Sequence, residues 1–174
     1  RMAGGGTPLR DQMRGFARGD EALAAELSEA YRQHNDAIHD EGISAFPDTR
    51  AALERLAAAG FCMGVVTSKR HEMAALGLEL SGISSFFDVL IGYDDFPECK
   101  PLPGPVLHGC ERLGLPPSAC LYVGDSPFDM QAGNAAGCLT VAALWGMFPR
   151  EALAAESPAL ECASLTQLAD LLGA

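Results

Sequence analysis

The sequence predicts an α/β fold in which a parallel sheet is covered by helices on both sides. Short apolar runs of strand length alternate with helical stretches along most of the chain. This regular alternation is typical of parallel strands that are joined by helical crossovers. The chain has 174 residues, of which 48% are hydrophobic and 20% are charged, so it can form one compact domain with a small additional lobe.

Helical spacing of apolar residues marks the first part of the chain. The pattern covers residues 20–39 and stops at Gly42. A second helix is expected over residues 48–60, with Asp48 as its N-cap. The segment that follows, 61–67, is a continuous apolar run, and we expect it to form a strand that is buried on both faces.

Helices and strands then alternate to the end of the chain. Further helices are expected at 71–80, 103–113, 127–136 and 165–172, and further strands at 87–91, 119–123 and 139–143. Open α/β sheets carry their functional groups in loops beyond the carboxyl ends of the strands. The polar segments at these ends, 67–69, 93–95 and 124–126, are therefore the first candidates for a functional site.

The charge of the chain limits its partners. Twelve Lys and Arg residues stand against 23 Asp and Glu residues, so the formal net charge is -11. This charge repels nucleic acid and anionic membrane surfaces, and we expect neither as a partner. It also repels an anionic substrate, so a site for phosphate would need local cations or a bound metal ion.

Cysteine usage and hydropathy indicate a soluble, cytoplasmic protein. The six cysteines are scattered without the short spacing of metal ligands, as expected for idle thiols in a reducing compartment. No apolar run approaches the roughly 18 residues of a membrane span, and the first residues contain no signal-peptide core. The oligomeric state stays open.

Asp125 and Asp129 are the strongest candidates for a metal site. A predicted buried strand delivers Asp125 into a turn, and Asp129 follows one helical turn later. Mg²⁺ is commonly held by one or two carboxylates together with waters and substrate phosphate. The alternative interpretation is a turn residue at a strand end followed by a solvated helix residue.

Two further segments contain groups that suit phosphate. Lys100 lies in a loop that prolines stiffen, and a fixed positive charge can neutralise phosphate oxygens. Thr67 and Ser68 lie at a strand end before a helix, where hydroxyl and backbone N–H groups favour anions. The alternatives are a solvated surface lysine and a simple N-cap by Ser68.

The order of these motifs resembles the haloacid dehalogenase superfamily. Thr67-Ser68 after a strand, Lys-Pro in a loop and Gly-Asp-Ser-x-x-Asp at 124–129 resemble its second, third and fourth motifs. The chain is most similar to the phosphoglycolate phosphatase group and the related bacterial pyrophosphatases. The resemblance implies a doubly wound, Rossmannoid fold with a small helical cap. Residues 1–44 would be part of the cap, and residues 45–174 would form the core.

The resemblance also implies a reaction and a role for each candidate residue. The reaction would be Mg²⁺-dependent hydrolysis of a small phosphate compound, such as a phosphoglycolate-like monoester or pyrophosphate. Thr67, with Ser68 close by, would bind the transferred phosphoryl group, and Lys100 would stabilise its charge. Asp125 would bind Mg²⁺ directly, and Asp129 would support the metal site or orient Lys100.

The first motif of the superfamily, Asp-x-Asp after the first strand, has no counterpart in these 174 residues. This motif supplies the nucleophile that forms an aspartyl-phosphate. We therefore expect the nucleophile and the first strand to lie outside this sequence. These residues alone should be inactive and should leave strand edges uncovered. A phosphomutase and a binding module without a nucleophile are the alternatives. A dehalogenase fits less well, because the two aspartates indicate a metal ion.

Overall fold

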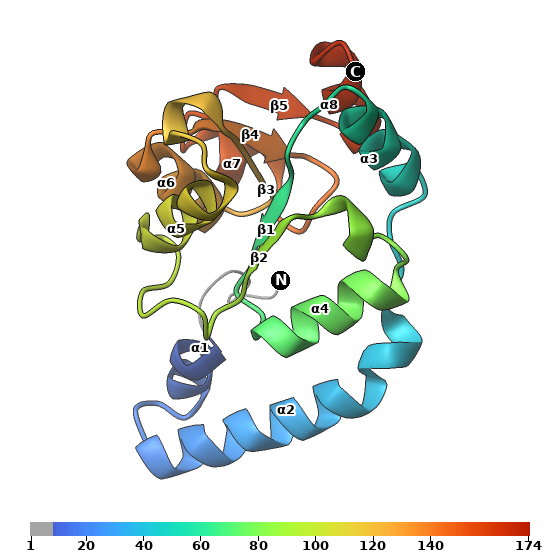
Figure 1. Ribbon diagram of the computed structural model, residues 1–174. Coiled ribbons are helices and arrows are strands. Elements are labelled where there is room, and N and C mark those ends of the chain that lie inside the picture. The colour runs from blue at the N-terminus through green and yellow to red at the C-terminus, as the bar shows by residue number, and fades with distance from the viewer. Residues whose placement is uncertain (1–8) are drawn as a thin grey trace.

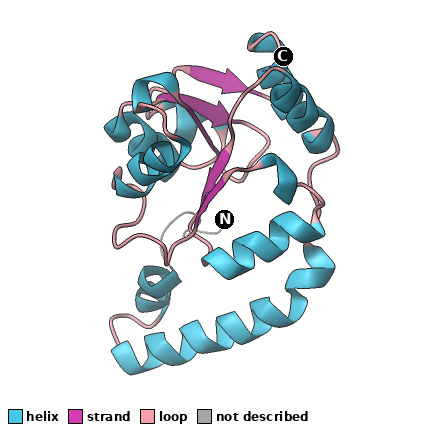
Figure 2. Cartoon of the chain, viewed as in Figure 1, coloured by secondary structure: helices cyan, strands magenta, loops and turns pink. Residues whose placement is uncertain are grey.

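The computed structural model describes residues 9–174 and confirms the α/β class with parallel strands (Figures 1 and 2). In chain order, the elements are α1 (Leu9–Phe16), α2 (Glu21–Gly42), α3 (Thr49–Ala58), β1 (Gly64–Val66), α4 (His71–Leu80), η1 (Ser84–Phe86), β2 (Val89–Ile91), α5 (Gly104–Leu113), η2 (Pro117–Ala119), β3 (Leu121–Gly124), α6 (Pro127–Ala136), β4 (Leu139–Ala143), α7 (Arg150–Ala154), β5 (Leu160–Cys162) and α8 (Leu165–Leu171). In Figure 1, α5 and α6 lie on one side of the strands, and α3, α4 and α8 lie on the other. The predicted covering of both faces is thus present.

Most predicted elements are confirmed, and the differences have local causes. The bounds of α4, α6 and β4 agree with the prediction. α1, α7 and β5 are not predicted, because each has eight residues or fewer and is too short to show a clear period. Asp48 lies at the N-cap position of α3, but its side chain makes no cap hydrogen bond there.

The sheet is divided into two parts. β1 pairs with β2, with Val66 opposite Ile91, while β3, β4 and β5 form a second parallel sheet in that order. Within the described residues, one edge of β1 and one edge of β3 have no partner strand. α5 packs on β1 and β2, α6 packs on β3 and β4, and α5 packs on α6. A shared layer of helices therefore joins the two parts.

The strands at this break are less buried than their neighbours. Ile91 of β2 and Val141 of β4 are almost fully buried, whereas Val123 of β3 is 36% exposed and β1 has no buried residue. The prediction of a strand at 61–67 that is buried on both faces is wrong, and β3 is likewise only partly buried. The physical reason is the unpaired edge of each strand, which leaves nearby side chains without cover.

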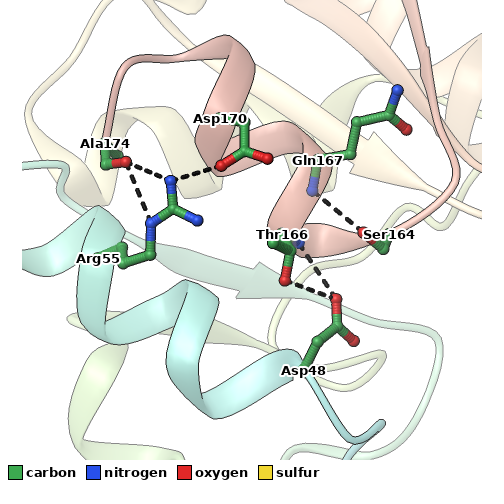
Figure 3. Close-up of polar contacts among 7 residues, drawn as sticks. All are labelled: Asp48, Arg55, Ser164, Thr166, Gln167, Asp170 and Ala174. Atoms are coloured by element: carbon green, nitrogen blue, oxygen red, sulfur yellow. Dashed lines mark hydrogen bonds and ion pairs between the residues drawn. The ribbon is translucent and has the colours of Figure 1, made fainter.

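Contacts between α3 and α8 connect segments that are far apart in the sequence (Figure 3). Arg55 Nη2 lies 2.6 Å from Asp170 Oδ1. Asp48 Oδ2 accepts hydrogen bonds from the backbone N and the Oγ1 of Thr166, at 3.2 and 3.0 Å. These bonds hold the pKa of the Asp48 carboxyl below its ordinary value. Asp48 therefore caps the start of α8, where Ser164 Oγ also accepts from Gln167 N.

α1 and α2 form a small cluster of their own. Met13, Ala17 and Ala24 are its buried residues, and α2 contacts the rest of the chain at α4. Residues 1–8, which belong to the predicted cap, lie outside the described residues. Across residues 9–174, none of the helices combines the length and the apolar character that crossing a membrane requires.

Candidate active site

The predicted site residues all lie in loops or first turns after strand ends. Thr67 and Ser68 follow β1, and Lys100 lies in the loop between β2 and α5. Asp125 follows β3, and Asp129 lies in the first turn of α6. Because the strands are parallel, these groups share one edge of the fold.

Lys100 connects the two parts of the sheet. Its Nζ lies 2.6 Å from Asp129 Oδ1, and it donates a longer hydrogen bond of 3.4 Å to the carbonyl oxygen of Val66, at the end of β1. The side chains of Lys100 and Asp129 are only 12% and 9% exposed. Lys100 is therefore held in a nearly buried ion pair, unlike a solvated surface lysine, and the pair is shielded from solvent screening.

Asp129 caps its own helix and holds Lys100 at the same time. Its Oδ2 accepts hydrogen bonds from Ser126 N at 3.1 Å and from Ser126 Oγ at 2.7 Å. The Ser126 Oγ in turn accepts from Asp129 N, which completes a capping box. A Cβ at Gly124 would lie 2.2 Å from Asp129 Cβ, so only glycine permits this approach. Both carboxylate oxygens of Asp129 are thus engaged, one by Ser126 and the other by Lys100.

Asp125 uses one of its two carboxylate oxygens in a hydrogen bond. Its Oδ2 accepts a hydrogen bond from Met147 N at 2.9 Å, and its Oδ1 has no partner among the described residues. Asp125 also lines a cleft of about 560 Å³ beside β3. No group of three or more His, Cys, Asp and Glu side chains in the described part of the chain is arranged to hold a metal ion. The second carboxylate oxygen of Asp125 is a donor of the type that Mg²⁺ prefers, since this ion is commonly held by one or two carboxylates together with waters.

Two residues that enclose Asp125 are not predicted from the sequence. Gly146 packs so closely that a Cβ there would lie 2.1 Å from Asp125 Cβ, and Met147 supplies the N–H group described above. Both follow β4, which carries no charged residue at its end. The only sequence signal for these residues is a glycine shortly after a strand, at the edge of the sheet that carries the functional loops.

Thr67 is positioned by the ladder between β1 and β2. Its N–H group donates to Ile91 O at 2.9 Å, and its Oγ1 accepts from Lys69 N at 3.2 Å. The hydroxyl proton stays available for a ligand. Thr67, Ser68 and Lys100 line one small pocket. α4 has Arg70 at its N-cap position, so Ser68 is not the cap of this helix.

Comparison with known proteins identifies the family that the chain resembles. A family model of haloacid dehalogenase-like hydrolases matches residues 5–143. Pyrophosphatase PpaX of Oceanobacillus iheyensis is 37% identical over 142 residues, which are 82% of this chain and 65% of that protein. A PpaX of Caldanaerobacter subterraneus is 40% identical over 132 residues, which are 76% of this chain and 60% of that protein. The chain thus spans less than two thirds of the length of these two relatives.

A solved structure is similar over most of the chain. The crystal structure of a predicted phosphoglycolate phosphatase from Haemophilus somnus matches with a TM-score of 0.78 at 25% identity. The match covers 93% of this chain and 73% of that one. The arrangement of helices and strands is therefore shared with an experimentally determined structure.

Proposed function

The chain belongs to the haloacid dehalogenase-like hydrolases, and we propose that the protein is a Mg²⁺-dependent phosphatase of small phosphate compounds. Phosphoglycolate-like monoesters and pyrophosphate are the proposed substrates, and the name of the Oceanobacillus relative supports pyrophosphate. The observation that carries the proposal is the 2.6 Å contact between Lys100 Nζ and Asp129 Oδ1. It brings a largely buried cation to the strand end that also carries Asp125.

Each group has a role in the proposed reaction. The Thr67 hydroxyl donates a hydrogen bond to a phosphoryl oxygen, and Lys100 stabilises the charge that develops there. Asp129 holds Lys100 in place, and Asp125 holds the metal ion with its free oxygen. When bound, Mg²⁺ supplies further positive charge to the phosphoryl oxygens. These cations offset the net charge of -11, which otherwise opposes an anionic substrate.

The nucleophile of the proposed reaction lies outside these 174 residues, in which no Asp-x-Asp sequence occurs. The unpaired edges of β1 and β3 support the proposal that a further strand inserts between them. The cleft beside Val123 and Asp125 supports the same place for its carboxyl end. A carboxylate delivered there would lie near Asp125. The 174 residues alone are accordingly expected to be inactive.

We assign residues 1–44 to a partial helical cap and residues 45–174 to the core. The separate cluster of α1 and α2 supports this division, since their buried residues pack mainly on one another. α2 contacts the core at α4, which begins next to the loop of Thr67 and Ser68. A cap in this position would lie close to a bound substrate.

The test is a phosphatase assay on the complete natural protein with a panel of small phosphate compounds. We expect turnover of pyrophosphate or a phosphoglycolate-like monoester that requires Mg²⁺ and stops when the metal is chelated. Absence of turnover for the whole panel would favour the binding module. Transfer of the phosphoryl group to a second hydroxyl without release of phosphate would favour a phosphomutase.

A further inference from the structure

The loops after β1 and β2 are joined beyond the ends of the strands. Thr67 N donates to Ile91 O at 2.9 Å, and Tyr93 N donates to Lys69 O at 2.8 Å. The backbone that follows Thr67 is therefore bonded to the backbone that leads toward Lys100. Neither loop can shift without moving the other or breaking these hydrogen bonds.

Two acidic side chains reinforce this connection at the start of α4. Asp94 Oδ1 accepts a hydrogen bond from His71 N at 2.7 Å. Asp95 Oδ2 accepts from Gly92 N at 2.7 Å and lies 2.5 Å from His71 Nδ1. The Gly92 N–H group, and after it His71, hold the pKa of Asp95 below its ordinary value. A Cβ at Gly92 would lie 2.4 Å from His71 N, so the loops are in tight contact.

The segment between Asp95 and Lys100 is held against α5. The ring of Phe96 lies against the ring of His108, with 5.3 Å between their centroids. A Cβ at Gly104, the first residue of α5, would lie 2.5 Å from Phe96 Cε1. A displacement of Asp95 is therefore passed along a constrained segment to Lys100 and is not absorbed by a free loop.

We propose that His71 and Asp95 are positioning residues, whose contact sets the place of Thr67 relative to Lys100. Neither side chain lines the pocket that Thr67 and Lys100 share, so neither is expected to touch the substrate. The inference rests on the proposed phosphatase function. Loss of the contact leaves both groups chemically intact but misplaces them, and small misplacements cost rate more than binding.

The test compares His71→Leu with His71→Asn in the complete protein. An asparagine amide can donate a hydrogen bond to Asp95 from near the position of Nδ1, whereas leucine has no donor. We expect kcat to fall about 10-fold in His71→Leu, with KM changed less than about 2-fold. In His71→Asn we expect kcat within about 3-fold of the wild-type value.

A double variant shows whether the two residues act through one contact. His71→Leu combined with Asp95→Ala should be no slower than Asp95→Ala alone, because Asp95→Ala already removes the contact with His71, together with the bond from Gly92 N. A wild-type kcat in His71→Leu, equal losses in the leucine and asparagine variants, or additive losses in the double variant would overturn the inference.

Hydrogen exchange separates this inference from the proposed function. In His71→Leu, the amides of Gly92 and Tyr93 should exchange faster than in the wild type, because their loop is released. If the wild-type protein hydrolyses no phosphate compound, the proposed function fails. Hydrogen exchange alone then tests the inference about His71 and Asp95. Unchanged exchange at these two amides would then refute the contact as a constraint on the loops.

Discussion

The two parts of the sheet contribute different chemistry to the candidate site. The two-stranded part carries the hydroxyl of Thr67 and leads to the cation of Lys100, while the three-stranded part carries Asp125 and Asp129. Their packing differs as well: β4 and β5 of the three-stranded part have fully buried residues, whereas in the two-stranded part β2 has a fully buried residue, Ile91, and β1 has no buried residue. The three-stranded part therefore supplies the acidic groups, and the two-stranded part is joined to it by the packing of α5 on α6 and by the ion pair between Lys100 and Asp129.

The largest loss of activity is expected when the carboxylate of Asp125 is removed from the three-stranded part. Asp125→Ala should lower Mg²⁺-dependent kcat/KM by roughly 10³-fold, because the site then loses the ligand that holds Mg²⁺, and with it the positive charge that stabilises the transition state. The melting temperature should change little, since Asp125 makes one described hydrogen bond. Asp88→Ala, at an exposed acidic residue beside β2, is the control and should retain wild-type kinetics. Full activity in Asp125→Ala would contradict the metal assignment.

Removing the link between the two parts should affect both turnover and stability. Lys100→Met is expected to lower kcat about 100-fold or more. It should also cost about 3 kcal/mol in the free energy of unfolding, because Asp129 stays buried without its partner. Lys100→Met with Asp129→Asn should recover part of the stability but none of the turnover. If Lys100→Met unfolds at the wild-type urea concentration, the ion pair does not join the two parts.

The difference in burial can be measured directly by urea unfolding. Met130 of α6 is fully buried, and Met130→Ala should lower the free energy of unfolding by about 2–5 kcal/mol. Val123 of β3 is 36% exposed, and Val123→Ala should cost less than about 1 kcal/mol in these 174 residues. Equal losses would show that the edge of β3 is covered as well as the core.

The smallest change in stability is expected when a lower pH protonates Asp48 at the contact between α3 and α8. The pKa of Asp48 is lowered in the folded state, so its contribution to stability is complete above the unfolded pKa of about 3.9. That contribution is lost as the pH falls through the lower, folded pKa. Asp48→Asn should therefore lose less stability than the wild type between about pH 5 and about pH 2. Parallel pH curves for the two proteins would contradict this assignment.

The sequence predicts the features that depend on the local spacing of apolar residues and on the positions of strand ends. The bounds of α4, α6 and β4 are confirmed, and the residues after β1, β2 and β3 lie at the expected edge. Burial of β1 is predicted wrongly, since an apolar run such as 61–67 does not reveal whether a strand has partners on both edges. The capping of α8 by Asp48 is also missed, because the two residues are 118 positions apart.

Asp129 couples the first turn of α6 to the position of Lys100. One oxygen closes the first turn of the helix, and the other binds the ammonium group. Fraying of that turn would free the lysine before the rest of the domain unfolds. Heat should therefore inactivate the protein at a lower temperature than the one at which its core melts.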